Sequence, residues 1–146
     1  MKLLVAVDLS ESTEKVVKKA EEIAKALSAG VWILHVAEPE PDFVGFEVGP
    51  QTVRDFVAKK FHSEHRQIQE IADRLRKAGL DTTALLVQGA TAETILNEAS
   101  ILNMDMIVVG SHGRGAMYQL LVGSVSERVL HKSECPILVI PTHERA

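Results

Sequence analysis

Five short, largely apolar runs that alternate with segments of helical periodicity set the strongest limit on the fold of this 146-residue chain. The runs are Leu3–Val7, Val31–Val36, Thr82–Val87, Met106–Val109 and Pro136–Ile140. Continuous apolar runs of this length are typical of strands buried on both faces, and strands that alternate with helices form parallel sheets. Since crossovers are short and right-handed, few topologies remain. We predict a single α/β domain over residues 1–146, with five parallel strands in the order 3-2-1-4-5 and helices on both faces.

Helical segments fill the intervals between these runs. Ser10 and Thr91 are placed to cap the first and third helices, because each precedes apolar residues at helical spacing. The longest helix is expected from about Thr52 to Ala78, with Gly79 placed to end it. Its apolar side consists of Val53, Phe56, Val57, Phe61, Ile68, Ile71, Ala72 and Leu75.

The segment Ala37–Pro50 breaks this regular alternation with several prolines and glycines. A loop of this length is often a lid or a binding segment, and a plain disordered excursion is the alternative. The sequence leaves both open.

A glycine-rich loop follows the fourth apolar run. The run ends at Gly110, Gly113 follows within the loop, and the next helix is expected to start near Gly123 and Ser124. Ser124 and Glu127 have the spacing of a capping box. A buried strand that opens into glycines and then a helix start is where open α/β sheets bind anions, since unpartnered backbone N–H groups collect there. We interpret the segment as a phosphate-binding loop; a tight turn followed by a capped helix is the structural alternative.

Three polar side chains lie near this loop in the predicted topology. The strand order places Asp8 and Gly110 at adjacent strand ends, on two sides of one crevice. Asp8 therefore either contacts a ligand or is a solvated or helix-capping carboxylate. His112 and Arg114 flank Gly113, and each either touches phosphate or is an exposed loop residue.

The glycine spacing is specific enough to indicate a family. Gly-x2-Gly-x9-Gly-Ser would occur by chance in a chain of this size on the order of 1% of the time or less. The pattern is similar to the nucleotide-binding signature of the universal stress protein family, in its ATP-binding branch. The resemblance covers nearly the whole chain, through Lys2–Asp8 with Ser10, His35-Val36, Asp105–Gly113 and Cys135–Val139.

This resemblance implies a Rossmann-like, adenine nucleotide alpha hydrolase-like fold with a site for ATP or AMP, and Mg²⁺ can accompany ATP. The residues that it implies for phosphate and ribose are Gly110, Gly113, Gly123 and Ser124, with Val109 and Val125 in the same site. It places Asp8 by the adenosine and the backbone of Val36 against adenine. It also implies a homodimer through the last strand, Ile137 to Ile140, whose unpaired edge gives a physical reason for pairing.

Composition and missing motifs exclude several other classes. A net charge of −4 argues against nucleic-acid binding through bulk electrostatics. With Cys135 as the single cysteine, no intrachain disulfide can form. No apolar stretch is long enough for a signal peptide or a membrane span, so we expect a soluble cytoplasmic protein. The chain also lacks the Gly-Lys-Ser/Thr of a P-loop.

The remaining histidines suggest no site. His62 and His65 have a spacing that suits a metal, but no third ligand accompanies them, so we expect a solvated helix face. His35, His131 and His143 form no constellation.

The function that we predict is a stress-response binding module, in which occupancy by an adenine nucleotide acts as a regulatory or sensing signal. Two alternatives remain. The protein is a slow ATPase or a self-phosphorylating phosphotransferase with Ser124 as acceptor, or it is a dimeric interaction protein that uses no nucleotide.

Overall fold

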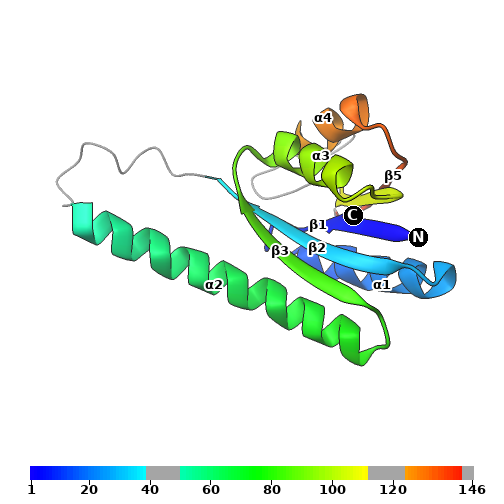
Figure 1. Cartoon of the computed structure of the whole chain (residues 1–146), viewed down its shortest axis with the longest axis horizontal. Coiled ribbons are helices and arrows are strands. Elements are labelled where there is room, and N and C mark those ends of the chain that lie inside the picture. The colour runs from blue at the N-terminus through cyan, green and yellow to red at the C-terminus, as the bar shows by residue number, and fades with distance from the viewer. Residues whose placement is uncertain (39–49, 112–123, 143–146) are drawn as a thin grey trace, which may run out of the picture.

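The sheet has the predicted topology. The computed structural model describes residues 1–38, 50–111 and 124–142, and these form a five-stranded parallel sheet of order β3-β2-β1-β4-β5 with four helices (Figure 1). The elements are β1 Lys2–Ala6, α1 Thr13–Leu27, β2 Gly30–Ala37, α2 Pro50–Lys77, β3 Thr82–Gln88, α3 Thr91–Ile101, β4 Met106–Gly110, α4 Ser124–Lys132 and β5 Ile137–Ile140. The predicted strand order and the predicted alternation of strands with helices are both confirmed.

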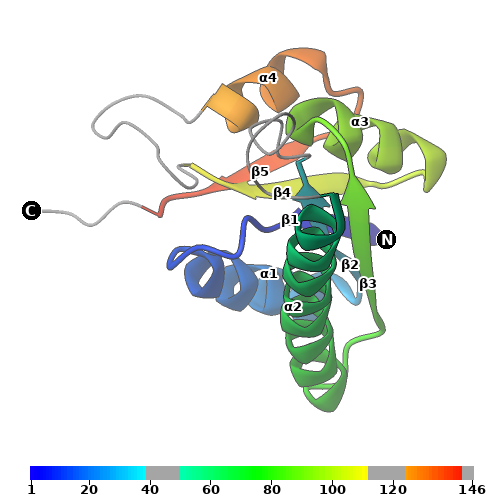
Figure 2. The ribbon, with the colours of Figure 1, turned by 90° about the vertical axis from the view of Figure 1, so that its left-hand side faces the viewer.

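Two helical layers cover the sheet, with α1 and α2 on one face and α3 and α4 on the other (Figure 2). Successive residues of a strand point to opposite faces, so each strand contributes to both layers. In β1, Leu3 and Val5 pack in the core under α1 and α2, whereas Leu4 packs under α3 and α4. All three are completely buried. The apolar runs are continuous because both faces are covered.

The helix starts differ from the sequence predictions by one or two residues. The N-cap of α1 is Ser12 instead of Ser10. The hydroxyl group of Ser10 donates to Asp8 Oδ1 at 2.6 Å. The N-cap of α3 is Ala90, and Thr91 is the first helical residue. The hydroxyl groups of both predicted caps donate to carboxylates instead, Ser10 to the nearby Asp8 and Thr91 to Glu38 at the end of β2. α4 is described from Ser124 onward and the residue before it lies outside the described residues, so the capping box of Ser124 and Glu127 stays a prediction.

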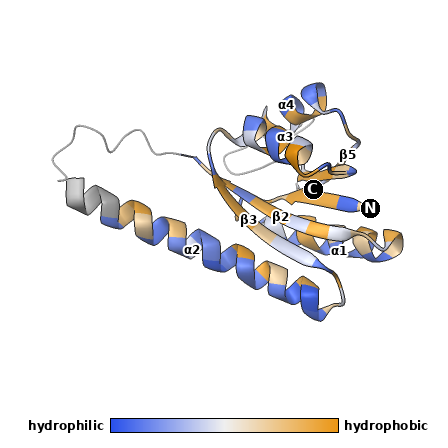
Figure 3. Ribbon diagram, in the orientation of Figure 1, coloured by the Kyte–Doolittle hydropathy of each residue, from blue (hydrophilic) through white to orange (hydrophobic). Residues whose placement is uncertain are grey.

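α2 packs on the sheet through only part of its length. Ile68, Ala72 and Leu75 are completely buried, whereas Phe56, Val57 and Phe61 are 47%, 40% and 37% exposed. The first half of α2 extends past the ends of β2 and β3 (Figure 1), although apolar residues continue along it (Figure 3). The predicted apolar side therefore faces the core only in the second half of the helix. Gly79 follows that half with a left-handed φ of +94°, as its predicted role in ending the helix requires.

No helix within the described ranges combines the length and the apolar character that a membrane-spanning segment needs.

Candidate functional site

The candidate site lies at the carboxyl ends of β1, β2 and β4. β1 lies between the other two strands, with Val5 in register with Val108 of β4 and Ala6 with Leu34 of β2. Asp8 follows β1, and Val36 and Gly110 lie at the ends of their strands. The fold thus brings together the described residues that the sequence analysis assigned to nucleotide binding. His112, Gly113, Arg114 and Gly123 lie outside the described residues.

Asp8 organises the turn into α1. Its Oδ1 accepts hydrogen bonds from the backbone N–H of Ser10 at 3.0 Å, from the Ser10 hydroxyl at 2.6 Å and from the Thr13 hydroxyl at 3.4 Å. A carboxylate that satisfies donors at a helix start has a structural role. This agrees with the capping alternative for Asp8, and contact with a ligand stays a prediction.

Three valines of the predicted site belong to one apolar cluster. Val36 and Val109 are 7% and 3% exposed, and the partly buried Val125 packs against the same cluster beneath α3 and α4. The side chains of Val36 and Val109 are therefore part of the core, and contact of the Val36 backbone with a ligand, which the resemblance implies, stays a prediction.

The start of α4 is fixed above the end of β4. The Ser126 hydroxyl donates to the Gly110 carbonyl at 2.6 Å, and the Ser111 N–H donates to the Ile140 carbonyl at 2.8 Å. Ser126 is buried and has this structural role. The neighbouring Ser124 is exposed at the first turn of the helix.

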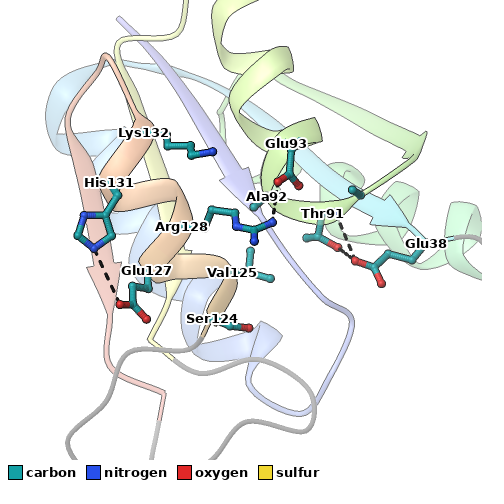
Figure 4. Close-up of a pocket in the computed structure, with 11 residues that line it drawn as sticks. Glu38, Thr91, Ala92, Glu93, Ser124, Val125, Glu127, Arg128, His131 and Lys132 are labelled. Atoms are coloured by element: carbon teal, nitrogen blue, oxygen red, sulfur yellow. Dashed lines mark hydrogen bonds and ion pairs between the residues drawn. The ribbon is translucent and has the colours of Figure 1, made fainter.

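A hollow of about 550 Å³ opens between α3 and α4 (Figure 4). The residues that line it are Glu38, Ala90, Thr91, Ala92, Glu93, Ser124, Val125, Glu127, Arg128, His131 and Lys132. The first turns of both helices therefore face the same space. Helix starts present N–H groups and a partial positive charge, so the two together suit an anionic ligand.

Two charged side chains of the hollow form an ion pair, and a third accepts a hydrogen bond from a hydroxyl group. Arg128 Nη1 lies 2.7 Å from Glu93 Oε1, and Glu38 Oε1 accepts from the Thr91 hydroxyl at 2.5 Å. The pKa of Glu93 is lowered, first by its own backbone N–H at the start of α3 and further by the Arg128 guanidinium. Sequence analysis missed Arg128 and Glu93. The four-residue spacing of Ser124, Arg128 and Lys132 was the available signal, because it places all three on one face of α4.

Metal ligands are not grouped in the described part of the chain. Among the residues of these three ranges, no cluster of three or more histidine, cysteine, aspartate or glutamate side chains could hold a metal ion.

Comparisons with known proteins identify the family. The family model described as "Universal stress protein family" matches residues 1–141. Universal stress protein YxiE of Bacillus subtilis is 31% identical over 144 residues, which cover 95% of this chain and 97% of that protein. The solved structure of MJ0577, from Methanocaldococcus jannaschii, is 28% identical with a TM-score of 0.80, covering 99% of this chain and 97% of the other.

Two further solved structures contain adenine nucleotides. A universal stress protein in complex with cAMP is 24% identical with a TM-score of 0.68, covering 98% of both chains. One from Archaeoglobus fulgidus in complex with dAMP is 21% identical with a TM-score of 0.64, covering 96% of this chain and 97% of that chain. The fold, the family match and these identities lead to one conclusion: the chain belongs to the universal stress protein family.

Proposed function

We propose that this protein binds ATP or AMP at the carboxyl ends of β1, β2 and β4, and that nucleotide occupancy regulates its role in a stress response. The observation that carries the proposal is the hollow of about 550 Å³ into which the first turns of α3 and α4 both open. Asp8, Val36 and Gly110 do not line this hollow, but the hydrogen bond from Ser126 to the Gly110 carbonyl joins the start of α4 to the end of β4. Ser124 and Val125 line the hollow, and Ser124 is the last residue of the Gly-x2-Gly-x9-Gly-Ser sequence pattern. The relatives solved with cAMP and dAMP support an adenine nucleotide as the ligand.

In this proposal each part of the site meets a different part of the nucleotide. The N–H groups and the Ser124 hydroxyl at the start of α4 bind phosphate oxygens, with Gly110 and Gly113 allowing close approach of the backbone. Adenine lies against the backbone of Val36 and the adenosine lies near Asp8. Mg²⁺ enters with ATP, on oxygens that the triphosphate supplies.

The proposed signal is occupancy of the site by the nucleotide, and hydrolysis is slow or incidental. Phosphoryl transfer needs a positioned base or water-orienting residue and charge neutralisation at the transferred group. Steady release of phosphate under excess Mg²⁺-ATP would support the ATPase alternative, and label transfer to Ser124 would support self-phosphorylation.

We also propose that a second copy pairs with the β5 edge. Ile137, Leu138 and Val139 of this strand are partly exposed, and in the described residues β5 pairs only with β4. An open apolar strand edge is a ready template for another strand. Sedimentation should give a dimer for the wild type and a monomer for Val139→Lys, while a wild-type monomer at micromolar concentration would contradict this pairing.

Calorimetric titration tests the nucleotide proposal. Mg²⁺-ATP, AMP, cAMP and GTP are titrated into protein shown to be free of carried-over ligand. We expect adenine-selective binding that is lost in Gly113→Val, since a branched side chain would occupy the space of a phosphate, and weakened in Ser124→Ala. Ser100→Ala, on the exposed surface of α3, is the matched control. No binding of any nucleotide by the wild type would refute the proposal and favour the interaction protein.

A further inference from the structure

One buried histidine joins three elements of the fold at the edge of the candidate site. His35 of β2 is 7% exposed. Its Nδ1 lies 2.8 Å from the carbonyl oxygen of Val7, and its Nε2 lies 2.5 Å from Oε2 of Glu64 on α2. The side chain of Glu64 is 13% exposed. A single ring therefore connects the chain after β1, the end of β2 and the middle of α2.

The two partners determine how many protons the ring carries. A carbonyl oxygen only accepts hydrogen bonds, so Nδ1 must be protonated. An unprotonated Nε2 and an ionised Glu64 carboxylate would be two acceptors that repel each other at this distance. A proton must therefore lie between these two atoms. Among the described residues, Glu64 is the only ionisable side chain that bonds to His35.

The hydrogen bond to Val7 lies where the pairing of β1 with β2 ends. The last residues in register are Ala6 and Leu34, after which the Val7 N–H still donates to the Leu34 carbonyl at 2.9 Å. The His35 ring then binds the Val7 carbonyl. Val7 directly precedes Asp8, and His35 directly precedes Val36. The ring thus acts one residue away from two positions assigned to the nucleotide.

We propose that the buried imidazolium–carboxylate pair of His35 and Glu64 positions Asp8 and Val36 for nucleotide binding and couples the site to α2. Loss of the pair moves the ends of β1 and β2 relative to each other and weakens binding. Because coupling between two sites is reciprocal, nucleotide occupancy is also communicated to α2. This inference rests on the proposed function, and His35 and Glu64 are positioning residues without ligand contact.

The first measurement uses the unliganded protein. Nitrogen-15 NMR of the histidine rings at neutral pH should show both ring nitrogens of His35 protonated. In Glu64→Gln the amide can donate to a neutral Nε2, so the hydrogen bond is kept, the charge is lost and only Nδ1 stays protonated. The backbone amide resonances of Asp8 and Val36 should shift in this variant more than those of β5.

The second measurement is nucleotide affinity by calorimetry. We expect Glu64→Gln to weaken AMP binding roughly 5-fold, in the lower part of the range for coupled sites. His35→Asn can still donate to the Val7 carbonyl but is too short to reach Glu64, and it should weaken binding at least as much. Glu70→Gln, on the exposed face of the same helix, should bind like the wild type. Thermal unfolding of each variant confirms that it is folded at the titration temperature.

The outcomes separate this inference from the proposed function. An unprotonated Nε2 in the wild type overturns the ion pair. Unshifted amides of Asp8 and Val36 in Glu64→Gln overturn the positioning role, and so does wild-type affinity in both variants. If the wild type binds no nucleotide, the proposed function fails, and the ring protonation and amide shifts of the unliganded protein still show whether the pair positions the two strand ends.

Discussion

The two helical layers each contain an ion pair that joins separate elements, in different surroundings. His35 and Glu64 meet at 2.5 Å with side chains 8% and 13% exposed, whereas Arg128 and Glu93 meet at 2.7 Å with side chains 58% and 50% exposed. The distances are similar, but the cost of losing one partner is not. A buried charge without its partner is strongly destabilising, while an exposed charge is solvated by water.

Because of this difference, the layer of α1 and α2 is held in place by its ion pair, whereas the layer of α3 and α4 can exchange a partner of its pair. The buried pair holds α2 against the strand ends, together with Ile68 one turn further along the helix, which is completely buried. The exposed pair crosses the hollow between α3 and α4, where a ligand could replace one partner at little cost. We therefore expect substitutions on the α2 side to change stability, and substitutions around Arg128 to change electrostatics.

The largest effect is expected from Ile68→Ala. Truncation of a fully buried isoleucine leaves a cavity, and we expect a loss of about 3 kcal/mol in the free energy of unfolding. Phe61→Ala, two turns earlier on the exposed half of α2, should cost only about 1 kcal/mol, since part of that ring already meets water. Denaturant unfolding measures both. Equal losses would mean that the two halves of α2 are packed alike.

His35→Phe should have the next largest effect. The substitution keeps a ring in the core but leaves the Glu64 carboxylate without a partner, and we expect a loss of about 2–3 kcal/mol. His65→Phe, at an exposed position of α2, is the matched control and should leave stability nearly unchanged. A loss in the control as large as that in His35→Phe would show that bulk, and not the unpaired carboxylate, is responsible.

The sequence predicted the sheet well because a strand buried on both faces needs a continuous apolar run. The prediction failed where the partner of a residue is distant in the sequence, or where another group competes for a capping side chain. Periodicity placed Phe61 and Ile68 on one side of α2, but it carries no information on where the sheet ends. Ser10 and Thr91 were predicted as caps, and the carboxylates of Asp8 and Glu38 engage them instead.

The candidate site was likewise predictable from the sequence only in part. Glycine spacing within one loop was visible in the sequence, and the strand order brought Asp8 and Gly110 to neighbouring strand ends. His35 was predicted to form no constellation, because its partner Glu64 is 29 residues away on another element. Only the packing of α2 against β2 and β3 brings the two together.

Removal of the exposed pair should leave stability unchanged within error. In Arg128→Ala the Glu93 carboxylate stays hydrated, so denaturant midpoints should match the wild type at low and high salt. AMP affinity provides the contrasting readout, since the substitution removes a cation from the hollow. A lowered midpoint that recovers in salt would mean that the pair contributes to folding after all.

The smallest effect is a change in the pKa of Glu93. In the folded protein this pKa lies below its ordinary value of 4.5, because the backbone N–H of Glu93 at the start of α3 and, to a lesser extent, Arg128 favour the carboxylate. Its contribution to stability is therefore present above the unfolded pKa and is lost as the pH falls through the folded value.

Arg128→Ala should raise the pKa of Glu93 while leaving it below 4.5, since the backbone donor remains. Glu22, whose pKa is lowered by its hydrogen bond with Lys19, is an internal control in the same carboxyl NMR titration and should not move. A return of Glu93 to its ordinary pKa would assign the whole shift to Arg128 and remove the start of α3 as a source of positive potential in the hollow.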